Sequence, residues 1–106
     1  MRVLIDECLD WRLGRALTGH YCVSAQKMGW GGLTNGALLE KAELEFDVFL
    51  TGDRNLSFQQ EASKFNIAVL VLHADSTQLH DTLLLMPQVL TLLPTLQSGH
   101  VVSVRL

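Results

Sequence analysis

The run "IAVLVL" at residues 67–72 is the feature that most restricts the fold of this chain. Its apolar residues follow one another with no polar residue between them, and every second one is β-branched. A strand with one face in water alternates apolar and polar side chains, whereas a strand covered on both faces does not. We therefore expect residues 67–72 to be an interior strand of a sheet with helices on both faces.

Shorter strand-like and helix-like patterns alternate along the chain before this run. Asn35 stands where a helix would have its N-cap, and Ser57 and Gln60 are spaced like a capping box for another helix. Alternation of strand and helix favours a parallel sheet. The predicted strands are at residues 2–6, 20–25 and 47–51, and the predicted helices are at residues 9–19, 37–46 and 57–65.

The chain after residue 76 has a different pattern. Residues 78–97 are Leu-rich at helical spacing, and Pro87 should break or kink this helix near Met86. Residues 101–106 alternate apolar and polar side chains, as in a half-buried edge strand. Two apolar stripes on the helix suggest that one joins the core and the other contacts a partner or a second copy of the chain. They are Leu79, Leu83, Met86, Leu90 and Leu93, then Leu85, Val89, Leu92 and Leu96.

These patterns predict one α/β domain over residues 1–106, a three-layer α/β/α sandwich with a mainly parallel central sheet. The chain is 48% hydrophobic and has a net charge of -3, which excludes an ordinary basic nucleic-acid-binding domain. No apolar stretch is long enough to cross a bilayer, and no export signal is visible. Cys8 and Cys22 show no metal-type spacing, so we expect a cytoplasmic protein with reduced thiols.

Acidic residues follow two of the predicted strands. Asp6 and Glu7 end the first strand, and Asp53 comes just after the strand at 47–51. Because ligands of parallel α/β sheets bind beyond the carboxyl ends of the strands, these carboxylates should converge if the two strands are neighbours. Oxygen ligands without His or Cys favour Mg²⁺ or Mn²⁺, which can activate water against a phosphodiester.

Each of these acids also has an ordinary structural explanation. Asp6 could be a helix cap, although Asp10 could serve the same helix, and Glu7 could pair with a nearby arginine. Asn35 alone is most simply an N-cap, and Glu40 is expected to be solvated. The four histidines are scattered without a ligand-like pairing, and Trp11 is a candidate for the core. Trp30, in a Gly-rich loop, could be a lid or a packing residue.

Several segments together resemble a PIN-like domain family related to the toxin ribonucleases of bacterial toxin–antitoxin systems. The matching segments are "VLIDECL", "MGWGGLTNGALLEKA", "FDVFLTGDRNLSFQQ" and "IAVLVL". The resemblance covers about residues 1–75 and leaves out residues 76–106. It implies a PIN-like sandwich with an acidic pocket at the strand ends, and a metal-dependent ribonuclease activity.

The resemblance also implies roles for single residues. Asp6 and Asp53 match the pocket acids that hold the metal, Glu7 matches a frequent acidic neighbour, and Thr51 matches a supporting threonine. Asn35 and Asn55 stand where many relatives have Asp; an amide oxygen can bind a hard cation but brings no charge, so weak Mg²⁺ or Mn²⁺ binding is expected.

The function predicted from these observations is a metal-dependent endoribonuclease, the toxin of a toxin–antitoxin pair. Asp6, Asp53, Glu7 and Asn35 would form the catalytic site, and an antitoxin protein would be the partner. Arg12, Lys27 and Arg54 are expected at the same sheet edge, where they would bind RNA phosphates.

Two other functions compete with this one. The first is a catalytically degenerate PIN-like module that acts by protein–protein interaction, through its edge strand and a groove beside Leu85, Val89 and Leu92. The second is a response-regulator receiver domain, which also has acids after the first and third strands. A receiver needs a lysine after the fifth strand, and this chain has none beyond Lys64, so we reject that reading.

Overall fold

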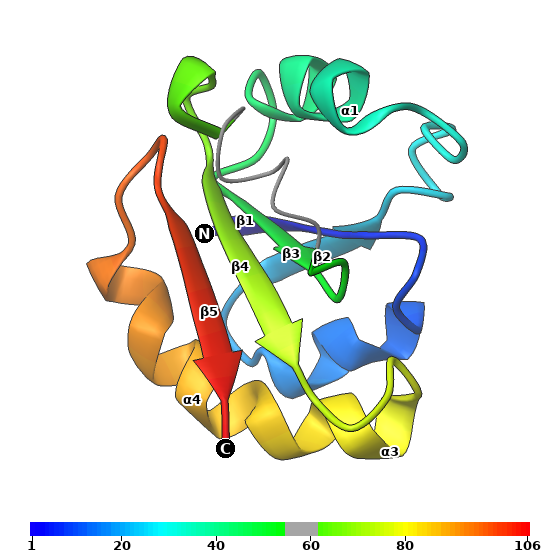
Figure 1. Cartoon of the computed structure of the whole chain (residues 1–106), viewed down its shortest axis with the longest axis vertical. Coiled ribbons are helices and arrows are strands. Elements are labelled where there is room, and N and C mark those ends of the chain that lie inside the picture. The colour runs from blue at the N-terminus through cyan, green and yellow to red at the C-terminus, as the bar shows by residue number, and fades with distance from the viewer. Residues whose placement is uncertain (55–61) are drawn as a thin grey trace.

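A sheet of five parallel strands forms the centre of the protein (Figure 1). The structure is a computed structural model and describes residues 1–54 and 62–106. The strand order is β2-β1-β3-β4-β5, and every neighbouring pair is parallel. The predicted α/β class and parallel sheet are confirmed. The strands are β1 (Arg2–Ile5), β2 (Tyr21–Ser24), β3 (Val48–Thr51), β4 (Ala68–His73) and β5 (Val101–Arg105).

Helical segments connect these strands. Between β1 and β2 lies a 3₁₀ helix, η1 (Trp11–Ala16), and between β2 and β3 lies α1 (Asn35–Ala42). A short 3₁₀ helix, η2 (Ala62–Lys64), precedes β4. The connection to β5 contains four consecutive helical segments, α3 (Leu79–Thr82), η3 (Leu83–Leu85), α4 (Met86–Leu92) and η4 (Leu93–Thr95). The predicted capping box of Ser57 and Gln60 lies outside the described residues.

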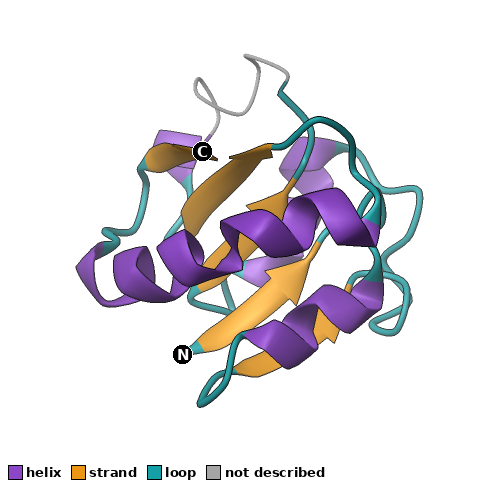
Figure 2. Cartoon of the chain, turned by 90° about the horizontal axis from the view of Figure 1, so that it is seen from below, coloured by secondary structure: helices purple, strands orange, loops and turns teal. Residues whose placement is uncertain are grey.

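Alternate residues of each strand enter two separate hydrophobic cores. Ile5 packs in one core with η1 and the helices of residues 79–95, which Figure 2 shows across one face of the strands. Leu4 points the other way, into a core with α1 and with Ala62 of η2. Successive residues of β4 are divided in the same manner, between Leu70 and Val69. The uninterrupted apolar run of β4 therefore follows from burial on both sides, as predicted.

Two helix predictions need correction. Residues 9–19 form only a six-residue 3₁₀ helix, although Leu9, Leu13 and Leu17 are buried as the spacing indicates. Glycine disfavours an α-helix, and at Gly14 a Cβ would lie only 2.7 Å from the Cβ of Cys22, so this segment packs too closely on β2 for a larger residue.

The predicted cap of α1 is also wrong by one residue. Thr34 is the N-cap, because its side-chain oxygen accepts the N–H of Ala37, and Asn35 is the first helical residue. Leu38 and Leu39 of this helix are buried as predicted, and so is Phe46, although the helix ends before it, at Ala42.

The helix interruption near Met86 is confirmed. The 3₁₀ segment η3 ends where the Met86 N–H bonds to the carbonyl of Leu83, and Pro87 lies in the first turn of α4. Proline has no N–H to donate to the carbonyl four residues earlier, so the α-helical ladder is broken there.

The division of the leucines into two stripes is wrong in part. Leu85 and Val89, expected in the outer stripe, are fully buried, whereas Leu83, expected in the core, is exposed together with Leu84. Leu85 and Val89 therefore cannot line a surface groove. In the described part of the chain, no helix is long and apolar enough to cross a membrane.

The connections differ in handedness. The crossover from β2 to β3 carries α1 over one face of the sheet, and the crossover from β4 to β5 moves in the same direction over the opposite face. The two therefore have opposite hands. The connection from β1 to β2 runs in the opposite direction along the sheet, and η1 covers the same face as the helices of residues 79–95. It therefore has the same hand as the crossover from β2 to β3. Almost all such crossovers in proteins have one hand, which makes the last one unusual.

We predict that Leu13→Ala lowers the free energy of unfolding by about 2–5 kcal/mol, because it leaves a cavity beneath η1. Leu13 is 0% exposed, whereas Leu44 is 83% exposed and provides a matched leucine. Leu44→Ala should change stability by no more than about 0.5 kcal/mol. Urea unfolding of both variants measures the difference, and equal stabilities would contradict the packing of η1.

Candidate functional site

The strand order places the ends of β1 and β3 side by side. Ile5 pairs with Leu50, and the ladder extends one residue further through a 2.9 Å bond from the Asp6 N–H to the Leu50 carbonyl. β1 connects to β2 on one side, while β3 lies on its other side, so the strand order reverses between β1 and β3. Such a reversal is where parallel α/β sheets usually have their ligand crevice.

A cavity of about 370 Å³ opens at this point. All four predicted catalytic residues contribute to its wall, namely Asp6, Glu7, Asn35 and Asp53. Among the described residues no lysine, arginine or histidine lines it. The remaining lining residues are Cys8, Ala25, Trp30, Leu33, Leu38, Gly52 and Thr77. The sequence-based expectation that the two strand ends meet at one pocket is therefore correct.

Thr51 connects the two strand ends from behind the cavity. Its side chain is 0% exposed, and its hydroxyl donates a 2.6 Å hydrogen bond to Oδ2 of Asp6. The hydroxyl oxygen of Thr51 also accepts the backbone N–H of Asp53, at 3.0 Å. Asp6 Oδ1 accepts the N–H of Glu7 at 2.8 Å. One buried hydroxyl thus holds the Asp6 carboxylate and the backbone of Asp53 in a fixed relation.

Asp6 is not a helix cap. Asp10 caps η1 instead, as its side chain accepts the N–H of Arg12. With the cap supplied elsewhere, the Asp6 carboxylate is directed to Thr51 and the cavity.

Glu7 forms hydrogen bonds with the Gly-rich loop and not with an arginine. Both of its carboxylate oxygens accept the N–H of Gly32, at 3.1 and 3.2 Å, and its backbone carbonyl accepts from the Gln26 side chain. A Cβ on Gly31 would lie 3.2 Å from Oε2 of Glu7, so the loop passes close to this carboxylate. The expected arginine partner is wrong for the described residues, and the acid instead positions the loop that carries Trp30.

Cys8 and Thr77 are site residues that the sequence did not indicate. The Cys8 sulfur lies 3.4 Å from Oδ2 of Asp6 and 3.9 Å from the Thr51 hydroxyl. Burial of this sulfur raises the pKa of the Cys8 thiol, and the neighbouring Asp6 charge raises it further. Thr77 reaches the cavity from the loop after β4, where Gly52 leaves room for it. The sequence signal that could have indicated Cys8 as a site residue is its position two residues after Asp6.

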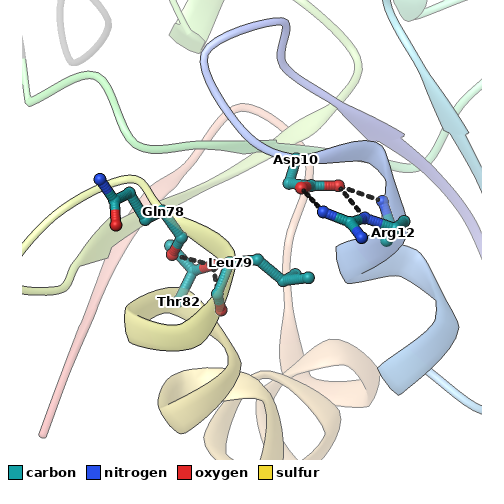
Figure 3. A network of polar contacts seen from close by, with 5 residues as sticks. All are labelled: Asp10, Arg12, Gln78, Leu79 and Thr82. Atoms are coloured by element: carbon teal, nitrogen blue, oxygen red, sulfur yellow. Dashed lines mark hydrogen bonds and ion pairs between the residues drawn. The ribbon is translucent and has the colours of Figure 1, made fainter.

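The predicted phosphate-binding residues do not line the cavity. Arg12 forms an ion pair with Asp10, at 2.7 Å, at the start of η1 (Figure 3). This contact, through hydrogen bonds from Arg12, lowers the pKa of Asp10 to about 2. Lys27 lines a different hollow, and Arg54 donates to the carbonyl of Ala74. Asn55 lies outside the described residues.

The remaining expectations for single residues have mixed outcomes. Glu40 is exposed, as expected. Trp11 is not in the core, because it is 58% exposed with the Arg15 guanidinium 4.8 Å from its ring centroid. Trp30 is half-buried in the cavity wall and makes an edge-to-face contact with Phe46.

The donor set of the cavity suits a hard cation held by few protein ligands. In residues 1–54 and 62–106, no group of three or more His, Cys, Asp or Glu side chains is arranged to hold a metal ion. Mg²⁺ is commonly bound through one or two carboxylates and keeps several of its waters, which Asp6 and Asp53 could satisfy.

We predict that Thr51→Val lowers the free energy of unfolding by about 1–3 kcal/mol, because the Asp53 N–H and an Asp6 oxygen lose their buried partner. Thr51→Ser keeps the hydroxyl and should retain more of the stability. Thermal and urea unfolding of the two variants provide the comparison. A loss in Thr51→Ser as large as that in Thr51→Val would mean that the methyl group contributes as much as the hydroxyl, and it would contradict the prediction.

We predict that Asp6→Asn lowers the pKa of Cys8 and speeds its alkylation by iodoacetamide at pH 8. The reactive form is the thiolate, and the variant removes a negative charge that disfavours it. Cys22 is an internal control, since Asp6 is not among the causes of its own raised pKa. Mass spectrometry follows both thiols, and an unchanged Cys8 rate would argue against its contact with Asp6.

Comparison with known proteins does not identify the function of this site. No protein-family model, no curated protein and no solved structure matches the chain. The PIN-like resemblance therefore stays a prediction, and the function has to be argued from the cavity itself.

Proposed function

We propose that the chain is a ribonuclease that uses Mg²⁺ or Mn²⁺, bound weakly by Asp6 and Asp53. The observation that supports this most is the meeting of carboxylates from two adjacent strand ends in one cavity, with no basic residue lining it among those described. Like charges in a confined space repel one another, and a divalent cation relieves that repulsion.

The cation would supply an activated water and neutralise charge on the phosphodiester. The protein's own residues have supporting tasks. Thr51 fixes the Asp6 carboxylate, and Glu7 holds the Gly-rich loop against the end of β1. Asn35, at the start of α1, adds an amide that can accept from a cation-bound water or donate to a phosphate oxygen.

The basic residues have a smaller part in this proposal than the sequence indicated. Lys27 and Arg54 are exposed and close in sequence to the cavity residues Ala25 and Asp53, so they would meet phosphates flanking the reacting one. Arg12 forms an ion pair with Asp10 and has no role in RNA binding in this proposal.

The toxin role and an antitoxin partner rest on the PIN-like resemblance alone. A toxic ribonuclease should arrest the growth of bacteria that express it, and Asp53→Asn should abolish the arrest.

We predict that purified protein cleaves RNA only with Mg²⁺ or Mn²⁺, and that EDTA stops the cleavage. Asp6→Asn and Asp53→Asn should each strongly reduce cleavage, because each variant removes one of the two carboxylates that would hold the cation. Glu40→Gln is the matched control, as Glu40 is an exposed acid of α1 outside the cavity lining. Full activity of Asp53→Asn would end the proposal.

A catalytically degenerate module that binds another protein is the second candidate. The exposed Leu83 and Leu84 of η3 and the edge position of β5 favour it. Calorimetric titration with Mn²⁺ separates the two candidates. Binding that is lost in Asp6→Asn supports the nuclease, and no binding at millimolar Mn²⁺ supports the interaction module.

A further inference from the structure

The acid-lined cavity has a second, apolar part that the proposed metal chemistry does not use. Its wall there consists of Ala25, Trp30, Leu33 and Leu38, which come from the end of β2, the Gly-rich loop and α1. The whole cavity, at about 370 Å³, falls in the range of small-molecule sites, which are roughly 300–1,000 Å³. The cavity as a whole is therefore large enough for a small ligand or for one unit of a larger one.

Trp30 is held firmly in this wall. Its backbone N–H donates to the Ala25 carbonyl at 2.9 Å, and its ring makes an edge-to-face contact with Phe46, with centroids 6.0 Å apart and planes at 83°. On either side of Trp30 the chain is held to Glu7, after the end of β1. The Gln26 side chain donates to the Glu7 carbonyl, and the Gly32 N–H donates to the Glu7 carboxylate. An aromatic ring fixed in this way can take a flat ligand with little loss of side-chain entropy.

We propose that the apolar part binds one unpaired nucleobase of the RNA, stacked on Trp30, while the adjoining phosphate lies at Asp6 and Asp53. The inference rests on the proposed ribonuclease function. A nucleotide joins a charged phosphate to a flat ring, which matches a cavity lined both by carboxylates, with their cation, and by an aromatic side chain. Base stacking on aromatic side chains is the usual way in which proteins hold single-stranded RNA.

The inference has a consequence for the form of the substrate. A base inside a duplex is paired and stacked on its neighbours, so it cannot reach Trp30 without being extruded. The cavity should therefore select single strands, loops and bulges.

A second aromatic hollow provides a built-in comparison. It has a volume of about 590 Å³ along the edge strand β2 and is lined by Trp11, Tyr21 and Lys27 among others. No acidic residue contributes to its lining among the described residues. The chain has two tryptophans, and one belongs to each hollow. Tryptophan fluorescence can therefore tell which hollow takes the base.

The experiment uses the single-tryptophan variants Trp11→Phe and Trp30→Phe with hexauridylate and hexaadenylate. Ca²⁺ replaces Mg²⁺, and gel electrophoresis checks that the RNA is intact. We expect both single strands to quench Trp30 fluorescence in Trp11→Phe and to leave Trp11 fluorescence unchanged in Trp30→Phe. A self-complementary duplex of the same charge per strand should quench neither.

Substitution of Trp30 separates stacking from volume. Trp30→Leu fills much of the space without an aromatic face and should weaken hexanucleotide binding at least about fivefold, whereas Trp30→Phe should stay close to the unsubstituted protein. Anisotropy of fluorescein-labelled hexanucleotide measures the affinities. Circular dichroism and the Mn²⁺ affinity, expected to be equal in the two variants, show that fold and cation site are intact.

The outcomes distinguish this inference from the proposed function. If Mn²⁺ binds but the hexanucleotides do not bind, or bind without a response from Trp30, the base site is refuted and the cation site stands. A response from Trp11 instead would assign RNA binding to the β2 hollow and also refute it. If Mn²⁺ does not bind to the unsubstituted protein, the ribonuclease proposal fails first, and this inference fails with it.

Discussion

The hydroxyl of Thr51 is the contact on which the geometry of the site depends. It lies at the end of an interior strand, fully buried, and joins the Asp6 carboxylate to the backbone of Asp53. A hydrogen bond to an ionised carboxylate is stronger than one between neutral groups, and burial makes its loss costly. The separation between two acids that are 47 positions apart in sequence is thus set by one side chain that never reaches the cavity surface.

The loop from residue 26 to residue 34 is positioned by residues that follow β1 and β2. The carboxylate of Glu7, after β1, accepts the N–H of Gly32, and the carbonyl of Ala25, after β2, accepts the backbone N–H of Trp30. The two neighbouring acids after β1 therefore have different contacts: Asp6 forms a hydrogen bond with Thr51 of β3, and Glu7 forms hydrogen bonds with the loop. These contacts explain why carboxylates and the loop that carries Trp30 line the same cavity, so that the two proposals concern one space.

The sequence predicted the features that depend on periodicity and strand order. The strands fall within a residue or two of the expected ranges, and the adjacency of β1 and β3 brings Asp6 and Asp53 to one cavity. Features that depend on individual contacts were missed. The Asp10–Arg12 pair removes an arginine from the site, and the close approach of Gly14 to Cys22 accompanies a 3₁₀ helix where spacing predicted an α-helix. Neither contact changes the hydrophobic pattern, so a pattern could not reveal it.

The opposite hand of the last crossover has a consequence for how so short a chain encloses its sheet. Had the helices of residues 79–95 followed the hand of the β2–β3 connection, they would have been added to the side already occupied by α1. The face of β3 and β4 that carries Leu50 and Leu70 would then have been covered only by the six residues of η1. The opposite hand places the Leu-rich segment on the other face instead, so that the apolar residues of β1, β3 and β4 are buried on both faces of the sheet.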